Sequence, residues 1–127
     1  MNFTEVLAGT APRADGMALS IPAAWHQGRT AYGGFSAALA LAAAMRVGGD
    51  MPPLRSASVS FVGPMYGDVD YAARVLRRGK NATWVSVEAK RGDETGLVAS
   101  FVFMGPVESA VHLNDRAPPA ALIPPAD

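Results

Sequence analysis

The segment Tyr32–Met45 constrains the fold of this chain more than any other, because it is rich in helix formers and almost free of polar side chains. Two glycines and then six alanines occur in it, and no charged residue appears before Arg46. A helix on a protein surface needs a polar face, and this one has almost none. We therefore expect a helix of about fourteen residues, roughly 21 Å long, that is buried on most of its sides.

The two glycines at the start of this helix, Gly33 and Gly34, predict a binding element. No bulky side chain covers the first turn, so its N–H groups, which have no partner within the helix, stay accessible. The positive end of a buried helix suits a polarised or anionic ligand group. The alternative interpretation is a core helix with a flexible start, and this segment alone is compatible with both.

Charge balance and missing residue types exclude several classes of function. Eleven basic and eleven acidic side chains cancel among 127 residues, so nothing in the composition favours nucleic acid or an anionic membrane as a partner. Cysteine is absent, and the two histidines, His26 and His112, lie far apart, which argues against disulfides, thiol catalysis and a metal site. No cofactor is expected. Lacking a signal peptide and an apolar run that could cross a bilayer, the chain is expected to be cytoplasmic.

The rest of the chain predicts strands around the helix. Alternating apolar residues indicate four strands and a continuous apolar run indicates a fifth. These strands are expected at 17–21, 54–62, 69–76, 83–90 and 97–104. A short helix is expected at 2–8, a turn-rich connection at 9–16 and a polar loop at 23–32. Short turns between the last four strands predict a meander that curls round the helix.

The chain is expected to form a single domain, 1–127, with its core at about 16–105 and a proline-rich tail at 106–127. One helix cannot cover both faces of a five-stranded sheet. We therefore expect an apolar outer sheet face, covered by another subunit or domain.

Four motifs, in this order and spacing, resemble the hotdog fold, specifically the thioesterase II-like acyl-CoA thioesterases. They are Gly33-Gly34 before the alanine-rich helix, the strand that ends in Phe61-Val62-Gly63-Pro64, the strand-turn-strand segment 75–83, and the closing Ala99-Ser100-Phe101. The resemblance covers about Trp25 to Met104. It implies an α+β hotdog fold, in which an antiparallel five-stranded sheet wraps around one long buried helix. Family members often join two such units, and the proline-rich tail resembles the linker to a second one.

This resemblance implies hydrolysis of an acyl-CoA or acyl-carrier thioester, with the amides of Gly33 and Gly34 as donors to the developing oxyanion. Two further residues are candidates for catalysis, the first as a base that activates water and the second as a group that orients water or substrate. They are His26, in the loop before the helix, and Ser58, at the strand position that holds His or Asp in relatives. Each also has a purely structural interpretation. His26 could be an ordinary packed or solvated loop residue, and Ser58 could belong to the more solvent-exposed face of an ordinary strand. The acidic residue that hotdog hydrolases commonly place near the helix is not visible in this sequence.

Six residues are candidates for binding the substrate. Basic residues would meet the phosphates of coenzyme A. An acyl tunnel between the helix and a facing subunit would be lined by residues such as Phe35, Leu39, Phe61 and Trp84. The six are Arg29, Tyr32, Phe35, Lys80, Asn81 and Trp84. Solvation is the simpler interpretation of the charged residues in turns.

Two functions remain open at this stage. The first is an acyl-CoA thioesterase that works as a homodimer or a dimer of dimers. The second is a non-catalytic acyl-CoA-binding or scaffold protein, equivalent to the degenerate half of a double-hotdog thioesterase. A hotdog dehydratase is a weaker alternative, because no pair of a histidine and an acidic residue occurs near the helix.

Overall fold

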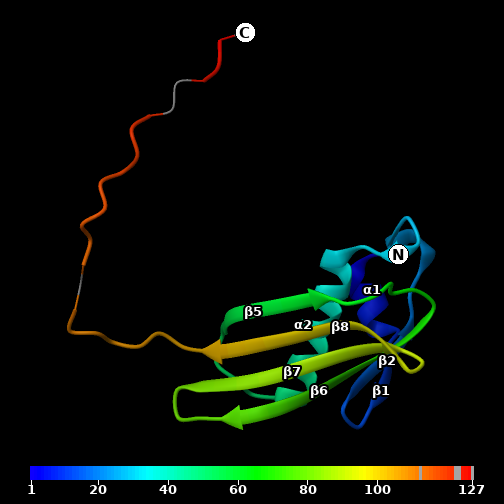
Figure 1. Cartoon of the computed structure of the whole chain (residues 1–127). Helices are drawn as coiled ribbons and strands as arrows, with labels where there is room; N and C mark the ends of the chain where they lie inside the picture. The colour runs from blue at the N-terminus through cyan, green and yellow to red at the C-terminus, as the bar shows by residue number, and fades with distance from the viewer. Residues whose placement is uncertain (112, 122–123, 127) are drawn as a thin grey trace.

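The computed structural model describes residues 1–111, 113–121 and 124–126, so His112 lies outside the described part. An antiparallel sheet packs against one long helix, and the described tail residues after the last strand form neither helix nor strand (Figure 1). In chain order the elements are α1 (Phe3–Ala8), β1 (Ala11–Arg13), β2 (Gly16–Ser20), the 3₁₀ helix η1 (Ala23–Trp25), β3 (His26–Gln27), β4 (Thr30–Ala31), α2 (Gly33–Gly48), β5 (Leu54–Phe61), β6 (Asp68–Arg78), β7 (Ala82–Arg91) and β8 (Glu94–Met104).

Helix α2 is the predicted central helix. Gly49 follows its last residue with a φ of 69°, a left-handed conformation that glycine adopts without strain. Leu39 and Ala43, on the side toward the sheet, are completely buried, whereas Met45 is 54% exposed. One side of this apolar helix therefore remains open in the single chain.

The sheet has six strands in the order β1-β2-β6-β7-β8-β5, one more than predicted. The additional strand is β1, which pairs with β2 inside the segment predicted as a turn-rich connection. A three-residue strand with Pro12 at its centre has little strand preference of its own, so pairing with a neighbour decides its conformation. Gly16 allows β2 to approach β6 closely, because a Cβ at this position would overlap the Tyr71 carbonyl oxygen.

Strand β5 lies at the edge of the sheet beside β8, so the meander contains only β6, β7 and β8. Three strand spacings, roughly 14 Å, separate β5 from β6. The connecting residues 62–67, named the crossing loop here, bridge that distance because six extended residues reach roughly 20 Å. The loop passes the β7–β8 end of the sheet, where the N–H groups of Val62 and Gly63 donate to the Gly96 carbonyl (Figure 1).

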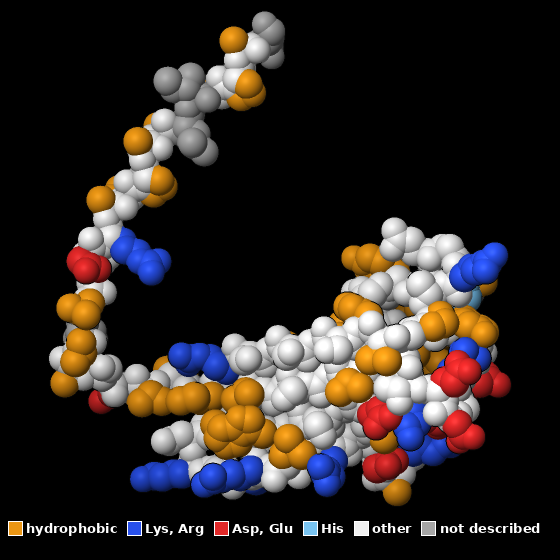
Figure 2. Space-filling view, in the orientation of Figure 1, with side chains coloured by type: hydrophobic (Ala, Val, Ile, Leu, Met, Phe, Trp, Pro, Cys, Tyr) orange, Lys and Arg blue, Asp and Glu red, His pale blue; other side chains and the backbone are white. Residues whose placement is uncertain are grey.

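The two faces of the sheet differ in character. Side chains that point toward α2 form the core, and the buried Tyr71 is the largest of them. The outward face has a row of serines across β5, β8 and β7, formed by Ser58, Ser100 and Ser86. Large apolar side chains such as Trp84 occur among these polar ones, and Figure 2 shows hydrophobic side chains gathered at one end of the sheet and scattered elsewhere. This face is therefore mixed, and the prediction of an apolar outer face is wrong.

The segment before α2 is more ordered than the predicted loop, since it contains η1 and the small β3–β4 hairpin. The Trp25 ring stacks on the Phe35 ring at a centroid distance of 4.8 Å. Phe3 of α1 packs edge-on against both rings. This aromatic cluster holds the segment against the first turn of α2.

Candidate functional site at the start of the central helix

The first turn of α2 presents backbone donors that have no partners. The N-cap residue, Tyr32, makes no capping hydrogen bond to the helix with its side chain. The first helical hydrogen bond runs from the Ser36 N–H to the Tyr32 carbonyl. The N–H groups of Gly33, Gly34 and Phe35 therefore have no acceptor within the described part of the chain. Together with the helix dipole, these donors make the start of α2 electropositive.

A cavity of about 380 Å³ opens at this turn. It is lined by Gln27, Thr30, Ala31, Gly33, Ser36 and the segment Phe61–Met65. A Cβ at Gly33 would lie 3.2 Å from the end of the Phe61 ring. The missing side chain at Gly33 thus keeps the start of the helix open to the cavity.

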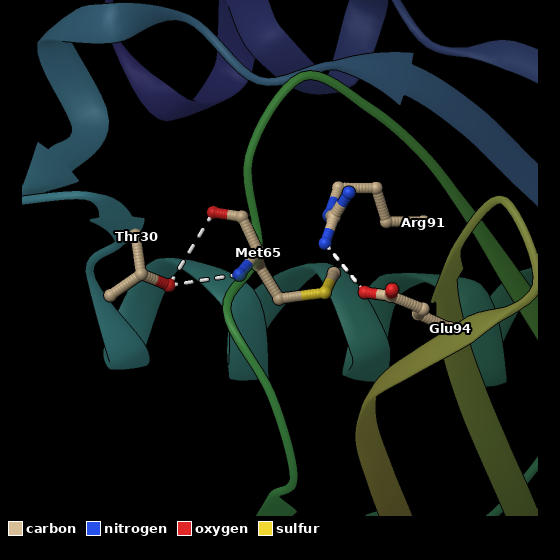
Figure 3. Close-up of polar contacts among 4 residues, drawn as sticks. All are labelled: Thr30, Met65, Arg91 and Glu94. Atoms are coloured by element: carbon tan, nitrogen blue, oxygen red, sulfur yellow. Dashed lines mark hydrogen bonds and ion pairs between the residues drawn. The ribbon is translucent and has the colours of Figure 1, made fainter.

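Thr30 fastens the crossing loop to the segment before α2 (Figure 3). Its Oγ1 accepts a hydrogen bond from the Met65 N–H at 2.9 Å and donates to the Met65 carbonyl at 3.4 Å. The Ala31 N–H donates to the same carbonyl at 2.7 Å. These bonds fix one wall of the cavity. The Thr30 hydroxyl uses its hydrogen bonds for the loop.

Arg91 supports the loop from the β7–β8 hairpin. Its guanidinium lies 4.0 Å from the centroid of the Tyr66 ring and forms an ion pair with Glu94 at 2.6 Å. Figure 3 shows this pair beside Met65. Glu94 is exposed, so its ion pair with Arg91 adds little stability. The contact between Arg91 and the Tyr66 ring therefore holds this part of the loop, directly after Met65.

Ser36 is a buried polar side chain of the cavity. Only 1% of the residue is exposed, and its Oγ has no hydrogen-bond partner among the described residues. The Ser36 carbonyl accepts a hydrogen bond from the Tyr71 hydroxyl at 3.1 Å. Burial raises the pKa of Tyr71 far above its ordinary value, so the phenol stays protonated and remains a donor to the first turn of α2.

Of the residues predicted at the helix start, Gly33 lines the cavity and the others do not. Gly34 belongs to the same turn, but a Cβ there would lie 2.7 Å from the Tyr32 ring. Tyr32 is 52% exposed, and Phe35 is buried against Trp25.

His26 and Arg29 lie on the β3–β4 hairpin, beside the cavity but outside its lining. His26 is half-buried, and its Nε2 has no hydrogen-bond partner among the described residues. Arg29 is exposed in the turn of the hairpin. Gln27, which follows His26, is the residue of this hairpin's first strand that reaches the cavity.

Ser58 lies on the outward face of the sheet, away from α2. It is exposed and pairs with Ser100 of β8, whereas its neighbour Val59 packs against the core. The structure therefore does not bring Ser58 to the start of the helix within one chain.

Lys80, Asn81 and Trp84 lie near the far end of α2. Lys80 and Asn81 are exposed in the turn between β6 and β7. Beside this turn, Arg78 donates a hydrogen bond to the carbonyl of Gly48, the last residue of α2, at 2.7 Å. Of the residues predicted to line an acyl tunnel, Leu39 is completely buried in the core and Phe61 is 60% exposed.

Sequence reasoning did not assign Thr30, Ser36 or Met65 to the site. A signal for Ser36 was present, because it is the one polar side chain between Gly34 and Arg46. Thr30 and Met65 are 35 residues apart, and they meet only because the crossing loop returns past the start of α2.

The cavity lining contains no Asp, Glu or His among the described residues. The same part of the chain contains no group of three or more metal-ligating side chains, and no helix there is long and apolar enough to cross a membrane.

Several solved structures share this architecture. A hotdog-fold protein of unknown function from Alicyclobacillus acidocaldarius matches with a TM-score of 0.76 at 18% identity, over 95% of this chain and 46% of its own. A candidate thioesterase II from Thermobifida fusca matches with a TM-score of 0.74 at 21% identity, over 98% and 46%. A Bacillus halodurans protein solved with CoA matches with a TM-score of 0.61 at 20% identity, over 69% and 64%. The chain is thus a hotdog-fold protein, as predicted, and it spans less than half the length of the first two relatives.

A family model described as the acyl-CoA thioesterase N-terminal domain matches residues 21–104. The chain belongs to this acyl-CoA thioesterase family, which confirms the resemblance seen in its motifs. No curated protein sequence matches it.

Proposed function

We propose that this chain is a thioester hydrolase unit that acts on an acyl-CoA or acyl-carrier thioester. The observation that carries the proposal is the first turn of α2, where unpartnered N–H donors lie at the open cavity. Hydrolysis of a thioester develops negative charge on the carbonyl oxygen, and fixed donors at a helix start stabilise that charge. Membership of the acyl-CoA thioesterase family supports the same class of reaction.

In the proposed reaction, the carbonyl oxygen of the thioester accepts hydrogen bonds from the Gly33 and Gly34 N–H groups. Water attacks the carbonyl carbon, the carbon–sulfur bond breaks, and one proton of the water passes to the leaving thiolate. The products are a carboxylic acid and a thiol. Phe61 and Met65, which line the cavity, would contact the substrate and exclude bulk water from it.

The CoA in the structure of the Bacillus halodurans protein supports a CoA thioester as the substrate. Arg29 is the better placed of the two basic residues predicted to meet phosphates. It lies on the hairpin that lines the cavity, whereas Lys80 lies at the far end of α2.

Binding of acyl-CoA without catalysis is the second candidate function. The observation that favours it is the cavity lining, which offers no Asp, Glu or His among the described residues to take a proton from water. If the chain does take part in hydrolysis, the carboxylate that activates water would have to come from another hotdog unit.

We also propose that β5 and the open side of α2 form the interface with such a unit, as a homodimer or a dimer of dimers. Seven of the eight β5 residues are exposed, and Leu54 and Met45 are 43% and 54% exposed. An unpaired edge strand presents free N–H and C=O groups, which a second copy of the chain would pair.

The experiment that separates the two functions measures both hydrolysis and binding. The full chain is incubated with acyl-CoA esters from acetyl to palmitoyl, release of the free thiol is followed, and affinity is measured by calorimetry with non-hydrolysable analogues. Turnover supports the hydrolase, and affinity without turnover supports the binding protein. Neither turnover nor affinity for any ester would contradict both.

A further inference from the structure

The Ser36 hydroxyl has an unusual environment for a serine inside a helix. Such a hydroxyl normally faces solvent or bonds the carbonyl four residues earlier. Here the residue is 1% exposed, and the Oγ has no hydrogen-bond partner in the described part of the chain. A buried polar group without a partner is unfavourable, so its presence at a ligand-sized cavity needs an explanation.

The geometry of the helix places this hydroxyl next to the donors of the first turn. Gly33 and Ser36 are three residues apart, so they lie on the same face of α2, and both line the cavity. Side chains in a helix lean toward its N-terminus, so the Ser36 side chain lies over the turn that begins at Gly33. Gly33 has no side chain that would separate the two groups.

We propose that the Ser36 Oγ–H is a second donor to the thioester carbonyl oxygen, beside the Gly33 N–H. This inference rests on the proposed hydrolase function and adds a side-chain donor to its backbone donors. Ser36 acts as a donor and not as a nucleophile, because no Asp, Glu or His of the described residues lines the cavity to remove its proton. The Tyr71 hydroxyl, bonded to the Ser36 carbonyl, holds this turn in place.

Two CoA derivatives test the proposal by binding alone. Acetonyl-CoA retains a carbonyl but cannot be hydrolysed, and propyl-CoA is a thioether of similar size without a carbonyl. For the variant Ser36→Ala we expect about tenfold weaker calorimetric affinity for acetonyl-CoA and unchanged affinity for propyl-CoA. Its kcat/KM should also fall about tenfold or more, because a donor to the carbonyl oxygen stabilises the developing oxyanion as well. The melting temperature should stay the same or rise, because no internal hydrogen bond is lost.

Two further variants are the controls. Ser100→Ala removes a hydroxyl from the outward face and should leave the affinity for both ligands, the kcat and the melting temperature unchanged. Ser36→Cys keeps the shape of the side chain with a slightly larger atom that is a weaker donor, so its affinity for acetonyl-CoA should be intermediate.

The proposal is overturned if Ser36→Ala lowers the affinity for both ligands equally, lowers the affinity for neither, or fails to fold. Each of these results leaves the hydrolase function intact as long as the wild-type protein turns over acyl-CoA. A wild-type protein that binds neither ligand and hydrolyses no ester overturns the proposed function, and this inference with it.

Discussion

Gly33 leaves the first turn of α2 accessible, because the nearest group that its Cβ would meet is the end of the Phe61 ring at 3.2 Å. Neither Gly33 nor Gly34 has a positive φ, so the backbone at both positions tolerates a side chain. The requirement for glycine is therefore one of space, which a larger residue tests directly.

The variant Gly33→Val should remain folded and lose function. Valine has a higher helix propensity than glycine, so the melting temperature should change by only a few degrees. Its branched side chain would enter the cavity and block approach to the free N–H groups, and loss of such a donor lowers turnover by about a hundredfold or more. Thiol release and calorimetry check this. Ala38→Val, on the same helix outside the cavity lining, is the matched control. Unchanged hydrolysis and binding in a folded Gly33→Val variant would place the site elsewhere.

Tyr71 links stability to alkaline pH. Burial raises its pKa in the folded state, whereas the unfolded chain titrates near the ordinary value of about 10. The stabilisation is complete below pH 10. As pH rises above about 10, the unfolded state loses a proton that the folded state keeps, and the free energy of unfolding falls by up to about 1.4 kcal/mol per pH unit.

Tyr71→Phe should remove this dependence. Below pH 9 its free energy of unfolding should be lower than that of the wild type by about 1 kcal/mol, for the lost bond to the Ser36 carbonyl. Above pH 10 the difference should shrink, because the phenylalanine has no proton to lose. Urea unfolding at pH 8 and at about pH 11 measures both. Parallel pH curves for the two proteins would show that Tyr71 does not titrate as described.

At the scale of elements, the crossing loop forms one wall of the cavity at the start of α2. Met65 is buried, and Gly96 lets the chain approach it, because a Cβ there would overlap the Met65 sulfur. The hydrogen bonds of Thr30 hold the loop from the other side.

Thr30→Val should weaken the wall without filling the cavity, because the two side chains have nearly the same shape. The Met65 N–H would lose its partner, which costs about 1–3 kcal/mol and lowers the melting temperature by several degrees. We expect a higher KM with a smaller effect on kcat, since the loop contacts the substrate rather than the reacting carbonyl. Thr4→Val, at an exposed position of α1, is the control. An unchanged melting temperature and KM would mean that the loop keeps its position without Thr30.

At the scale of the whole molecule, β5 and the open side of α2 leave apolar groups and an unpaired strand edge exposed in the single chain. We expect the full chain to sediment as a dimer or a larger assembly at micromolar concentration. Ala57→Lys places a charge in the middle of this edge, where lysine opposes strand pairing, and should produce monomers. Leu76→Lys, at a position of β6 that is 50% exposed, should leave the assembly intact. A stable wild-type monomer would contradict the interface, and an unaffected Ala57→Lys assembly would place it elsewhere.

The sequence by itself determined the central helix, its glycine start, most of the strand segments and the family. These features depend on helix propensity, on alternation and on glycine, all of which act over a few neighbouring residues. It also showed that Ser36 interrupts an apolar run, although not where that hydroxyl points.

Only the tertiary structure decided the place of β5, the path of the crossing loop and the burial of Ser36. Alternation shows that Ser58 and Val59 face opposite sides of a strand, but not which side faces α2, because a shift of one residue in register exchanges the faces. The contact between Thr30 and Met65, 35 residues apart, likewise depends on how the strands pair. Strand pairing sets which distant segments become neighbours, and no local preference specifies it.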